Sequence, residues 1–248
     1  MQLDFYYWSC QCPLNGQMLE LLEQYKGHMN IKLHDITHAE NTAKAENIFF
    51  PTLTVLDKQY RYFHPLTRPF LEQVKAGLVP AEKPYLPHLG VDIYQGDIVP
   101  ITWYNCILAG SCTGRVNNPC TQDKSIFLAQ EGLDIYGFMN IESNRLLGGA
   151  EYMPSKQVPY PIPKDEHTAF ITCVYVSDSE FDYKTPALKA LEAYLKKKYT
   201  KVLGISDEQG VFPNGNLDFF LRNGYADEGV ISEEKDYCRL HLVSKRLL

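Results

Sequence analysis

The sequence lacks several features that would assign it to a class of protein at once. It has 24 Lys and Arg against 30 Asp and Glu, and a net charge of −6 disfavours nucleic acid as a partner. No apolar run approaches the roughly 18 residues that a membrane-crossing helix needs. The first residues lack the basic segment, followed by an apolar segment, of a secretory signal. We therefore expect a cytoplasmic protein with neither a nucleic-acid nor a membrane partner.

Paired cysteine motifs are also scarce, although the chain has seven cysteines. An odd count in a reducing compartment favours free thiols over a framework of disulfides. Cys106, Cys112 and Cys120 follow one another without a Cys-x-x-Cys pair, so a structural zinc site has only weak support. We expect no metal, and we interpret these three residues as buried thiols.

What is present is the composition of a globular α/β protein. The chain has 248 residues, of which 45% are apolar, which is enough for one large domain or two ordinary ones. The stretch LVPAEKPYLPHLG contains three prolines and no clean period, which is typical of a linker. We predict one domain at residues 1–80, a linker at 81–94 and a second domain at 95–248.

The first 80 residues alternate between strand and helix patterns. Apolar and β-branched runs predict strands at residues 3–8, 31–36, 49–55 and 59–63. Helical spacing, a capping threonine and terminal glycines predict helices at about residues 18–25, 38–47 and 69–76.

This order, together with the stretches WSCQCP and FFPTLTV, resembles the thioredoxin fold. The resemblance implies that Pro51 is a cis-proline beside the cysteine motif, and it makes Cys10 and Cys12 the redox candidates. The family carries Cys-x-x-Cys, whereas the spacing here is Cys-x-Cys. A thioredoxin-like module that binds or scaffolds without redox chemistry therefore remains an alternative.

Residues 95–248 form a second series of strand and helix patterns. Strands are predicted at residues 97–102, 135–142, 146–153, 168–176, 201–205 and 238–243. Helices are predicted at residues 103–109, 119–133, 186–199 and 217–223.

Two stretches of this half, GGAEYMPSKQVPYPIPKDEHTAFITCVYVSD and LDFFLRNGYADEG, resemble the GNAT acetyltransferase superfamily, nearest to a bacterial subfamily labelled YoaP-like. The resemblance implies a mixed sheet with flanking helices and an enzyme that transfers an acetyl group from acetyl-CoA. The acceptor would be a small-molecule or peptide amine. In that family the pantetheine arm of the donor pairs with the strand that here contains Val174, Tyr175 and Val176.

The same resemblance implies a site for the pyrophosphate of CoA. GNAT enzymes hold it on backbone amides of a glycine-containing loop at a helix start. The matching window here is DYKTPA, in which Asp182 and Thr185 replace the expected basic residue and first glycine, and Pro186 has no amide. Lys184 and Ala187 remain as cofactor-binding candidates.

Candidate catalytic groups follow from the chemistry of amine acylation. Glu151 and His167 can act as the general base that deprotonates the amine. Phe220 stands where many GNAT members place a tyrosine that acts as the general acid. Phenylalanine has no proton to donate, and Tyr225 or Tyr175 can replace that tyrosine as proton donor.

Two functions of other classes remain as alternatives. DYKTPA favours a non-catalytic binding protein with a degenerate CoA cleft, and Cys10 with Cys12 favours a thiol–disulfide oxidoreductase.

Overall fold

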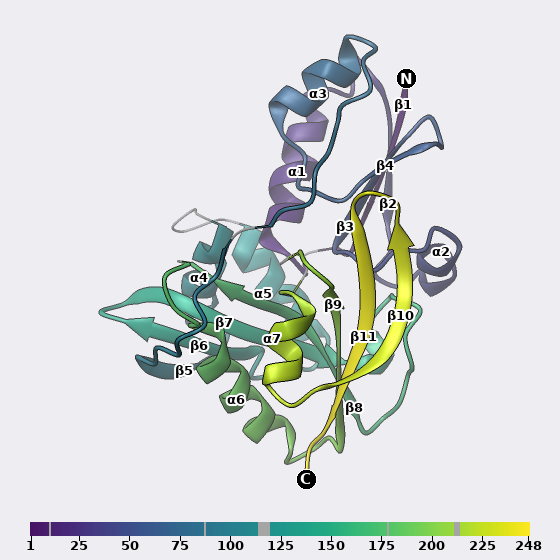
Figure 1. Ribbon diagram of the computed structural model, residues 1–248. Helices are drawn as coiled ribbons and strands as arrows, with labels where there is room; N and C mark the ends of the chain where they lie inside the picture. Colours follow the sequence, from purple (N-terminus) through teal and green to yellow (C-terminus); the bar gives the residue numbers. More distant parts are fainter. Residues whose placement is uncertain (10, 87, 114–119, 178, 211–213) are drawn as a thin grey trace. The chain divides into compact units, whose positions relative to one another are not determined.

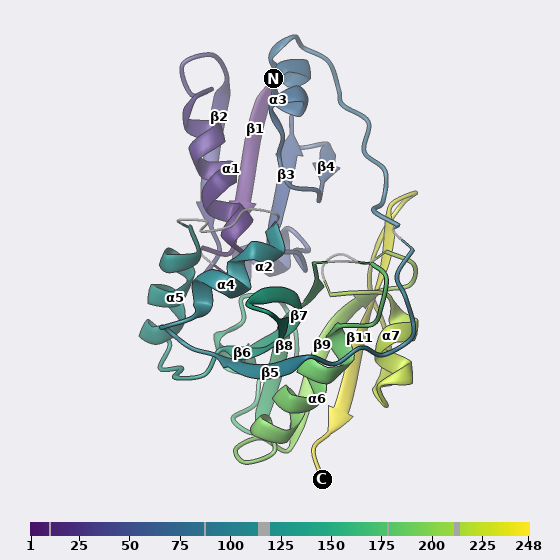
Figure 2. The ribbon, with the colours of Figure 1, turned by 90° about the vertical axis from the view of Figure 1, so that its left-hand side faces the viewer.

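The chain contains two compact units, each with its own sheet (Figures 1 and 2). The computed structural model describes residues 1–248 except 10, 87, 114–119, 178 and 211–213. The smaller unit contains Met1–Lys83 and Pro159–Pro161, and the larger unit contains Pro84–Val158 and Ile162–Leu248. None of the helices in these described ranges is long and apolar enough to cross a membrane.

The smaller unit is built on a four-stranded sheet with the order β2-β1-β3-β4. β1 pairs with β2 in parallel and with β3 antiparallel, and β3 pairs with β4 antiparallel. The predicted strands and helices of this region are confirmed, with ends that shift by a few residues. In chain order they are β1 (Gln2–Tyr7), α1 (Pro13–Glu23), β2 (Asn30–Asp35), α2 (Glu40–Ala45), β3 (Thr52–Leu56), β4 (Tyr60–Tyr62) and α3 (Arg68–Lys75).

The two faces of this sheet differ in character because side chains alternate along a strand. On β1, Leu3 and Phe5 join an apolar core that includes Leu22 of α1 and Leu71 of α3. The side chain of Asp4, between them, belongs to the opposite face. One face of the sheet is therefore apolar and covered by α1 and α3, and the other is polar.

The larger unit contains a seven-stranded sheet with the order β10-β11-β9-β8-β7-β6-β5. Every neighbouring pair is antiparallel except β8 with β9. The strands are β5 (Asp97–Ile101), β6 (Gly137–Glu142), β7 (Arg145–Pro154), β8 (Thr168–Val176), β9 (Lys201–Asp207), β10 (Ala226–Glu234) and β11 (Cys238–Arg246). The helices are α4 (Cys106–Ala109), α5 (Cys120–Gln130), α6 (Lys184–Leu195) and α7 (Leu217–Arg222), with 3₁₀ turns at Gly110–Thr113 and Ser155–Gln157.

Two elements of the larger unit differ from the prediction. β10 has no counterpart among the predicted strands, because acidic residues and Gly229 hide its pattern at the edge of the sheet. α4 is shorter than the predicted helix, because the Asn105 side chain accepts from the Thr102 N–H (2.8 Å) and donates to the Pro100 carbonyl (2.9 Å). These bonds hold the preceding residues in a turn.

The pairing of β7 with β8 decides which side chains share a face. Glu151 lies opposite Cys173, and Gly149 lies opposite Tyr175, so all four belong to one face. The alternate positions, such as Ala150, belong to the other face, which α6 covers.

His241 on β11 joins three elements at the sheet edge. Its Nδ1 lies 2.9 Å from both carboxylate oxygens of Asp227 on β10, and its Nε2 lies 3.1 Å from Oε1 of Glu208, directly after β9. Burial opposes the charged imidazolium and is the largest single influence, but the hydrogen bonds and charges of both carboxylates outweigh it and raise the pKa of His241. The imidazolium therefore forms ion pairs that join β11 to β10 and to the residue after β9.

We expect the stability of the protein to depend on pH through these ion pairs of His241. A raised pKa in the folded state gives stability that is complete below the pKa of the unfolded chain and is lost as the pH rises through the folded pKa. The midpoint of urea unfolding, followed by circular dichroism from about pH 5 to about pH 9, should fall less steeply in His241→Gln than in the natural protein. The control is His88→Gln, an exposed histidine of the same unit. Identical pH dependence in His241→Gln and the natural protein would show that the ion pairs of His241 do not contribute to stability.

Candidate active site

β8 and β9 separate in the middle of the larger sheet. Their parallel ladder joins Thr168, Ala169 and Phe170 to the first three residues of β9 and then ends. β8 continues to Val176 without further pairing to β9 in the described part of the chain. Val174, Tyr175 and Val176 therefore lie beyond the described ladder with β9, and this side of their backbone is suited to pair with another molecule.

Asn214 sits where the two strands separate. Its Nδ2 donates to the carbonyls of Ile171 on β8 (3.4 Å) and Ile205 on β9 (3.2 Å). The residue is 2% exposed, and its Oδ1 accepts no hydrogen bond from the described residues. A buried acceptor without a partner is costly, so this oxygen is suited to an N–H group of a ligand.

β8 also carries a bulge at this point. Glu151 pairs with Cys173 and Tyr152 pairs with Ile171, which leaves Thr172 as the extra residue. A bulge bends the strand and changes the direction of neighbouring side chains and backbone groups. The bulge thus lies just before residues 174–176, the part of β8 beyond the described ladder with β9.

A buried ion pair lies on the adjoining strand, on the face away from α6. The Glu151 carboxylate contacts the Lys124 ammonium of α5, and the two side chains are 5% and 10% exposed. Burial of two charges is tolerable when they are paired. Glu151 is therefore a fixed carboxylate beside the bulge.

Tyr175 shares this face, two residues after Cys173. A Cβ at Gly149 would lie 2.4 Å from Cζ of Tyr175, so the ring occupies space that only a glycine leaves on β7. Burial of the hydroxyl raises the pKa of Tyr175 well above its usual value, and the Glu151 carboxylate acts in the same direction. The hydroxyl therefore keeps its proton at neutral pH and can donate a hydrogen bond.

The structure brings some of the predicted site residues together and leaves others apart. Val174, Tyr175 and Val176 lie on β8 beyond its described ladder with β9, close to Glu151 in register. His167 is exposed just before the opposite end of β8, where its carbonyl accepts from the Thr200 N–H (2.8 Å).

The tyrosine predicted after α7 is also apart from this group. Tyr225 is buried against the Phe220 ring at 5.1 Å, and burial, with the charge of Glu192 on α6, raises its pKa well above the usual value. Because α6 covers the other face of the sheet, Tyr225 does not join Glu151.

The start of α6 already contains an anion. The Asp182 carboxylate accepts from the backbone N–H groups of Lys184 and Thr185 (3.0 Å each) and from the Thr185 hydroxyl (2.7 Å). Asp182 is 6% exposed, Pro186 has no N–H, and Ala187 is fully buried. The amides with which a helix start would bind a phosphate are therefore largely occupied.

Part of the predicted linker lies against this same loop. Gly90 N–H donates to the Ser179 carbonyl (2.8 Å), and Asp182 N–H donates to the Asp92 carbonyl (2.8 Å). Residues 90–94 thus pair with the segment that precedes α6 and cover its backbone.

Lys184 is a buried cation at this helix start. It is 5% exposed, and its Nζ lies 3.9 Å from the centroid of the Phe219 ring on α7. Burial lowers the pKa of Lys184 to about 8, although the Asp182 charge opposes the shift. Its ammonium forms no ion pair with the residues that the structure describes.

Sequence reasoning missed Lys124 and Asn214. Neither belongs to a recognisable motif, and each meets its partners only through contacts between distant segments. The ion pair of Lys124 with Glu151 and the hydrogen bonds of Asn214 form only in the assembled sheet, so the sequence gives no sign of them.

The redox candidates lie in the smaller unit. Cys10 falls outside the described residues, and Cys12 directly precedes α1 in extended conformation. The Pro51 carbonyl accepts from the Trp8 N–H (3.0 Å) and from Nδ2 of Asn15 (3.4 Å), so this proline adjoins the cysteine motif. Among the described residues, no group of three His, Cys, Asp or Glu could hold a metal ion.

Comparisons with known proteins found similarity to solved structures of acetyltransferases. No protein-family model matches the chain, and no curated protein matches it. An N-acetyltransferase from Staphylococcus aureus Mu50 is 17% identical with a TM-score of 0.45, covering 61% of this chain and 98% of its own. A ribosomal-protein-alanine N-acetyltransferase from Brucella melitensis is 13% identical with a TM-score of 0.44, covering 60% and 98%. An aminoglycoside 6'-N-acetyltransferase complexed with coenzyme A is 11% identical with a TM-score of 0.44, covering 62% and 98%.

Removing one partner of the buried ion pair should destabilise the larger unit strongly. Lys124→Met leaves the Glu151 carboxylate buried without a counter-charge, which costs about 3 kcal/mol of unfolding free energy. The double variant Lys124→Met/Glu151→Met should recover most of this loss, because it leaves no unpaired charge. Urea unfolding measures both. Equal destabilisation of the single and double variants would contradict the pairing.

Proposed function

We propose that the larger unit is an acyltransferase of the GNAT type. It takes an acyl group from a pantetheine thioester, with acetyl-CoA as the first donor to test, and transfers it to the amine of a small molecule or peptide. The observation that carries the proposal is the separation of β8 from β9, with Asn214 between them. The side of residues 174–176 that lies beyond the described ladder with β9 suits the amides of a pantetheine arm, which can pair with it as an added strand does. The strand order and the GNAT-like sequence stretches support the same assignment.

The two ends of CoA meet different conditions. The pantetheine arm fits, because residues 174–176 lie beyond the described ladder with β9, and Oδ1 of Asn214 accepts no hydrogen bond from the described residues. Both can offer partners for its amides. The pyrophosphate does not fit the start of α6, because the Asp182 carboxylate holds the amides of Lys184 and Thr185 and adds a negative charge. We therefore expect the nucleotide end to contribute little to binding.

The remaining chemistry belongs to residues of the chain. A bound thioester supplies an activated acyl group. The Glu151 carboxylate, held in place by the Lys124 ammonium, is suited to receive a proton from the attacking amine. The Tyr175 hydroxyl keeps its proton and is suited to donate a hydrogen bond to negative charge that develops during transfer.

A binding experiment tests the donor assignment. Calorimetric titration of the reduced protein with CoA and with pantetheine should give dissociation constants within about threefold of each other, because the pyrophosphate gains no amide contacts. Asp182→Ala frees two amides and removes a charge, so it should tighten CoA binding by about tenfold and leave pantetheine binding unchanged. If neither ligand binds at millimolar concentration, the proposal fails. CoA binding far tighter than pantetheine binding in the natural protein would contradict the account of the helix start.

A kinetic experiment tests the catalytic group. Release of thiol from acetyl-CoA in the presence of a panel of amines reports turnover. Glu151→Gln should lower kcat by about 100-fold, because it removes the general base. Glu166→Gln makes the same chemical change at an exposed surface ion pair and should leave kcat unchanged. A large loss in His167→Gln with none in Glu151→Gln would assign the base to the other predicted residue.

A second candidate function is binding without catalysis. The capped start of α6 favours it, because an enzyme that uses CoA gains from amides that are free to hold the phosphates. Saturable binding of pantetheine with no turnover of any amine would support this candidate over the first.

For the smaller unit we propose a thioredoxin-like accessory domain. Its strand order, the directions of its strands and the position of Pro51 beside Trp8 support this assignment. Reduction of insulin disulfides by the protein, lost in Cys12→Ser, would add a thiol oxidoreductase activity to the domain.

A further inference from the structure

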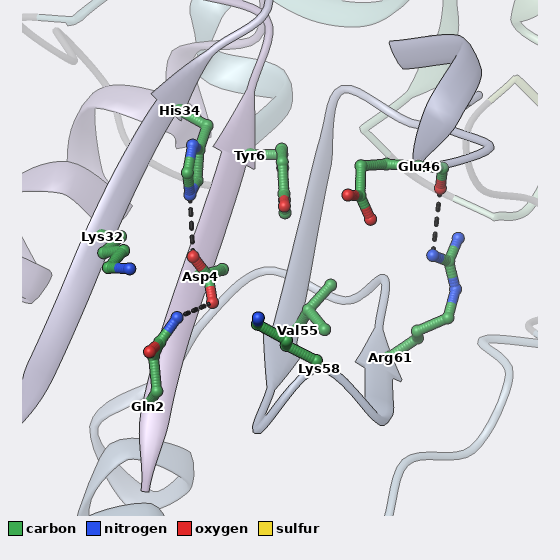
Figure 3. A pocket seen from close by; sticks show the side chains of 9 residues that line it. All are labelled: Gln2, Asp4, Tyr6, Lys32, His34, Glu46, Val55, Lys58 and Arg61. Atoms are coloured by element: carbon green, nitrogen blue, oxygen red, sulfur yellow. Dashed lines mark hydrogen bonds and ion pairs between the residues drawn. The ribbon is translucent and has the colours of Figure 1, made fainter. Parts of the chain in front are cut away.

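The smaller unit contains a cavity on the polar face of its sheet (Figure 3). Its volume is about 400 Å³, within the range of sites for small molecules. The lining comes from β1, β2, β3, β4, the turn between β3 and β4, and the residue after α2. Val55 is the one aliphatic side chain among the described residues that line it. This composition suits a polar ligand.

The floor of the cavity is fixed by hydrogen bonds. Asp4 is 7% exposed, and its two oxygens lie 2.8 Å from Nε2 of His34 and 2.6 Å from Nε2 of Gln2. The His34 ring stacks on the Tyr6 ring, with centroids 4.4 Å apart and planes 15° apart. A ligand therefore meets groups that are already ordered, which lowers the entropic cost of binding.

Two groups of the floor, Tyr6 and Asp4, have shifted pKa values. Burial, followed by the charges of Glu46 and Asp4, raises the pKa of Tyr6 to about 12, so its hydroxyl remains a hydrogen-bond donor. Burial opposes the charge of Asp4, but the hydrogen bonds from His34 and Gln2, together with nearby positive charge, outweigh it and lower the Asp4 pKa. Asp4 is therefore a charged acceptor at neutral pH.

Cationic groups outnumber carboxylates around this cavity, although the whole chain has a net charge of −6. The three cationic residues are Lys32, Lys58 and Arg61, and the two carboxylates belong to Asp4 and Glu46. The Arg61 guanidinium is held by the Glu46 backbone carbonyl at 3.0 Å, whereas neither lysine ammonium forms an ion pair with any described residue. Two ammonium groups are thus available to an anion.

The turn that carries Lys58 is held at the cavity by an uncommon conformation. Asp57 and Lys58 have φ of +48° and +59°, a left-handed region that costs a residue such as lysine about 1 kcal/mol. The Asp57 carboxylate accepts from the Gln2 N–H (2.7 Å), and the Asp57 N–H donates to the Gln2 carbonyl (2.9 Å). These bonds clamp the turn to β1, so that Lys58 is presented to the cavity.

We propose that this cavity binds a small phosphorylated polyol, a ligand of the sugar-phosphate class. The phosphate would lie at Lys32 and Lys58, and ligand hydroxyls would donate to the carboxylates of Asp4 and Glu46. Hydroxyls suit these carboxylates better than a ligand ammonium does, because the surrounding cations repel a further positive charge. An apolar ligand is excluded by the polar lining.

The test uses the intact chain and D-ribose 5-phosphate as the probe. Calorimetric titration should show saturable one-to-one binding, with D-ribose and inorganic phosphate each weaker by about tenfold or more. Lys58→Asn should weaken binding by about tenfold, because it removes one phosphate contact. Asparagine tolerates the left-handed conformation, so this variant keeps the turn, and the loss cannot be ascribed to unfolding. Lys26→Asn, the same change at an exposed lysine after α1, should bind as the natural protein does.

Three results would overturn the proposal. One is the absence of saturable binding of ribose 5-phosphate at millimolar concentration. Another is equal affinity of Lys58→Asn and Lys26→Asn for the probe. The third is equal binding of inorganic phosphate and ribose 5-phosphate, since the carboxylates would then have no role with ligand hydroxyls.

Discussion

The three-residue ladder between β8 and β9 is the constraint on which the larger unit depends. Because the strands separate after Phe170, the described ladder between two interior strands of a seven-stranded sheet ends early. The backbone of residues 174–176 then lies beyond that ladder, where it can pair with another molecule. Asn214 gives one hydrogen bond to each strand and so holds them at the point of separation. The Thr172 bulge and the Glu151 carboxylate lie beside the same point, which makes this part of the sheet the place where chemistry is best supported.

Two buried carboxylates of this unit have opposite consequences for a ligand. Glu151 is paired with the Lys124 ammonium, a side chain of another element. Asp182 is balanced by backbone N–H groups at the start of α6, the position at which many proteins bind a foreign anion. The first arrangement holds a carboxylate in a buried place on the sheet. The second uses the backbone N–H groups of a helix start for the protein's own carboxylate.

Charge is distributed differently on the smaller unit. The period of two along β1 places Leu3 and Phe5 in the apolar core and Asp4 and Tyr6 on the other face. That face holds a cationic cavity in an acidic protein, and a strained turn presents Lys58 to it. The two units thus offer two separate chemistries: a short ladder between two separating strands in one, and a preorganised polar cavity in the other.

The sequence by itself determined most of the elements, because hydrophobic periods, prolines and capping residues act over a few neighbouring residues. Thr67 caps the start of α3 as predicted, and β8 has the predicted limits, 168–176. The edge strand β10 escaped prediction, because its acidic residues and glycine form no clear period. The sequence alone also identified residues 174–176 and Glu151 as candidate site residues. It further showed that DYKTPA, before α6, differs from the pyrophosphate-binding loop of GNAT enzymes. Only the tertiary structure decided that Lys124 pairs with Glu151, that Asn214 joins two strands and that Asp182 caps a helix. Each of these depends on groups that approach one another only after the sheet is assembled.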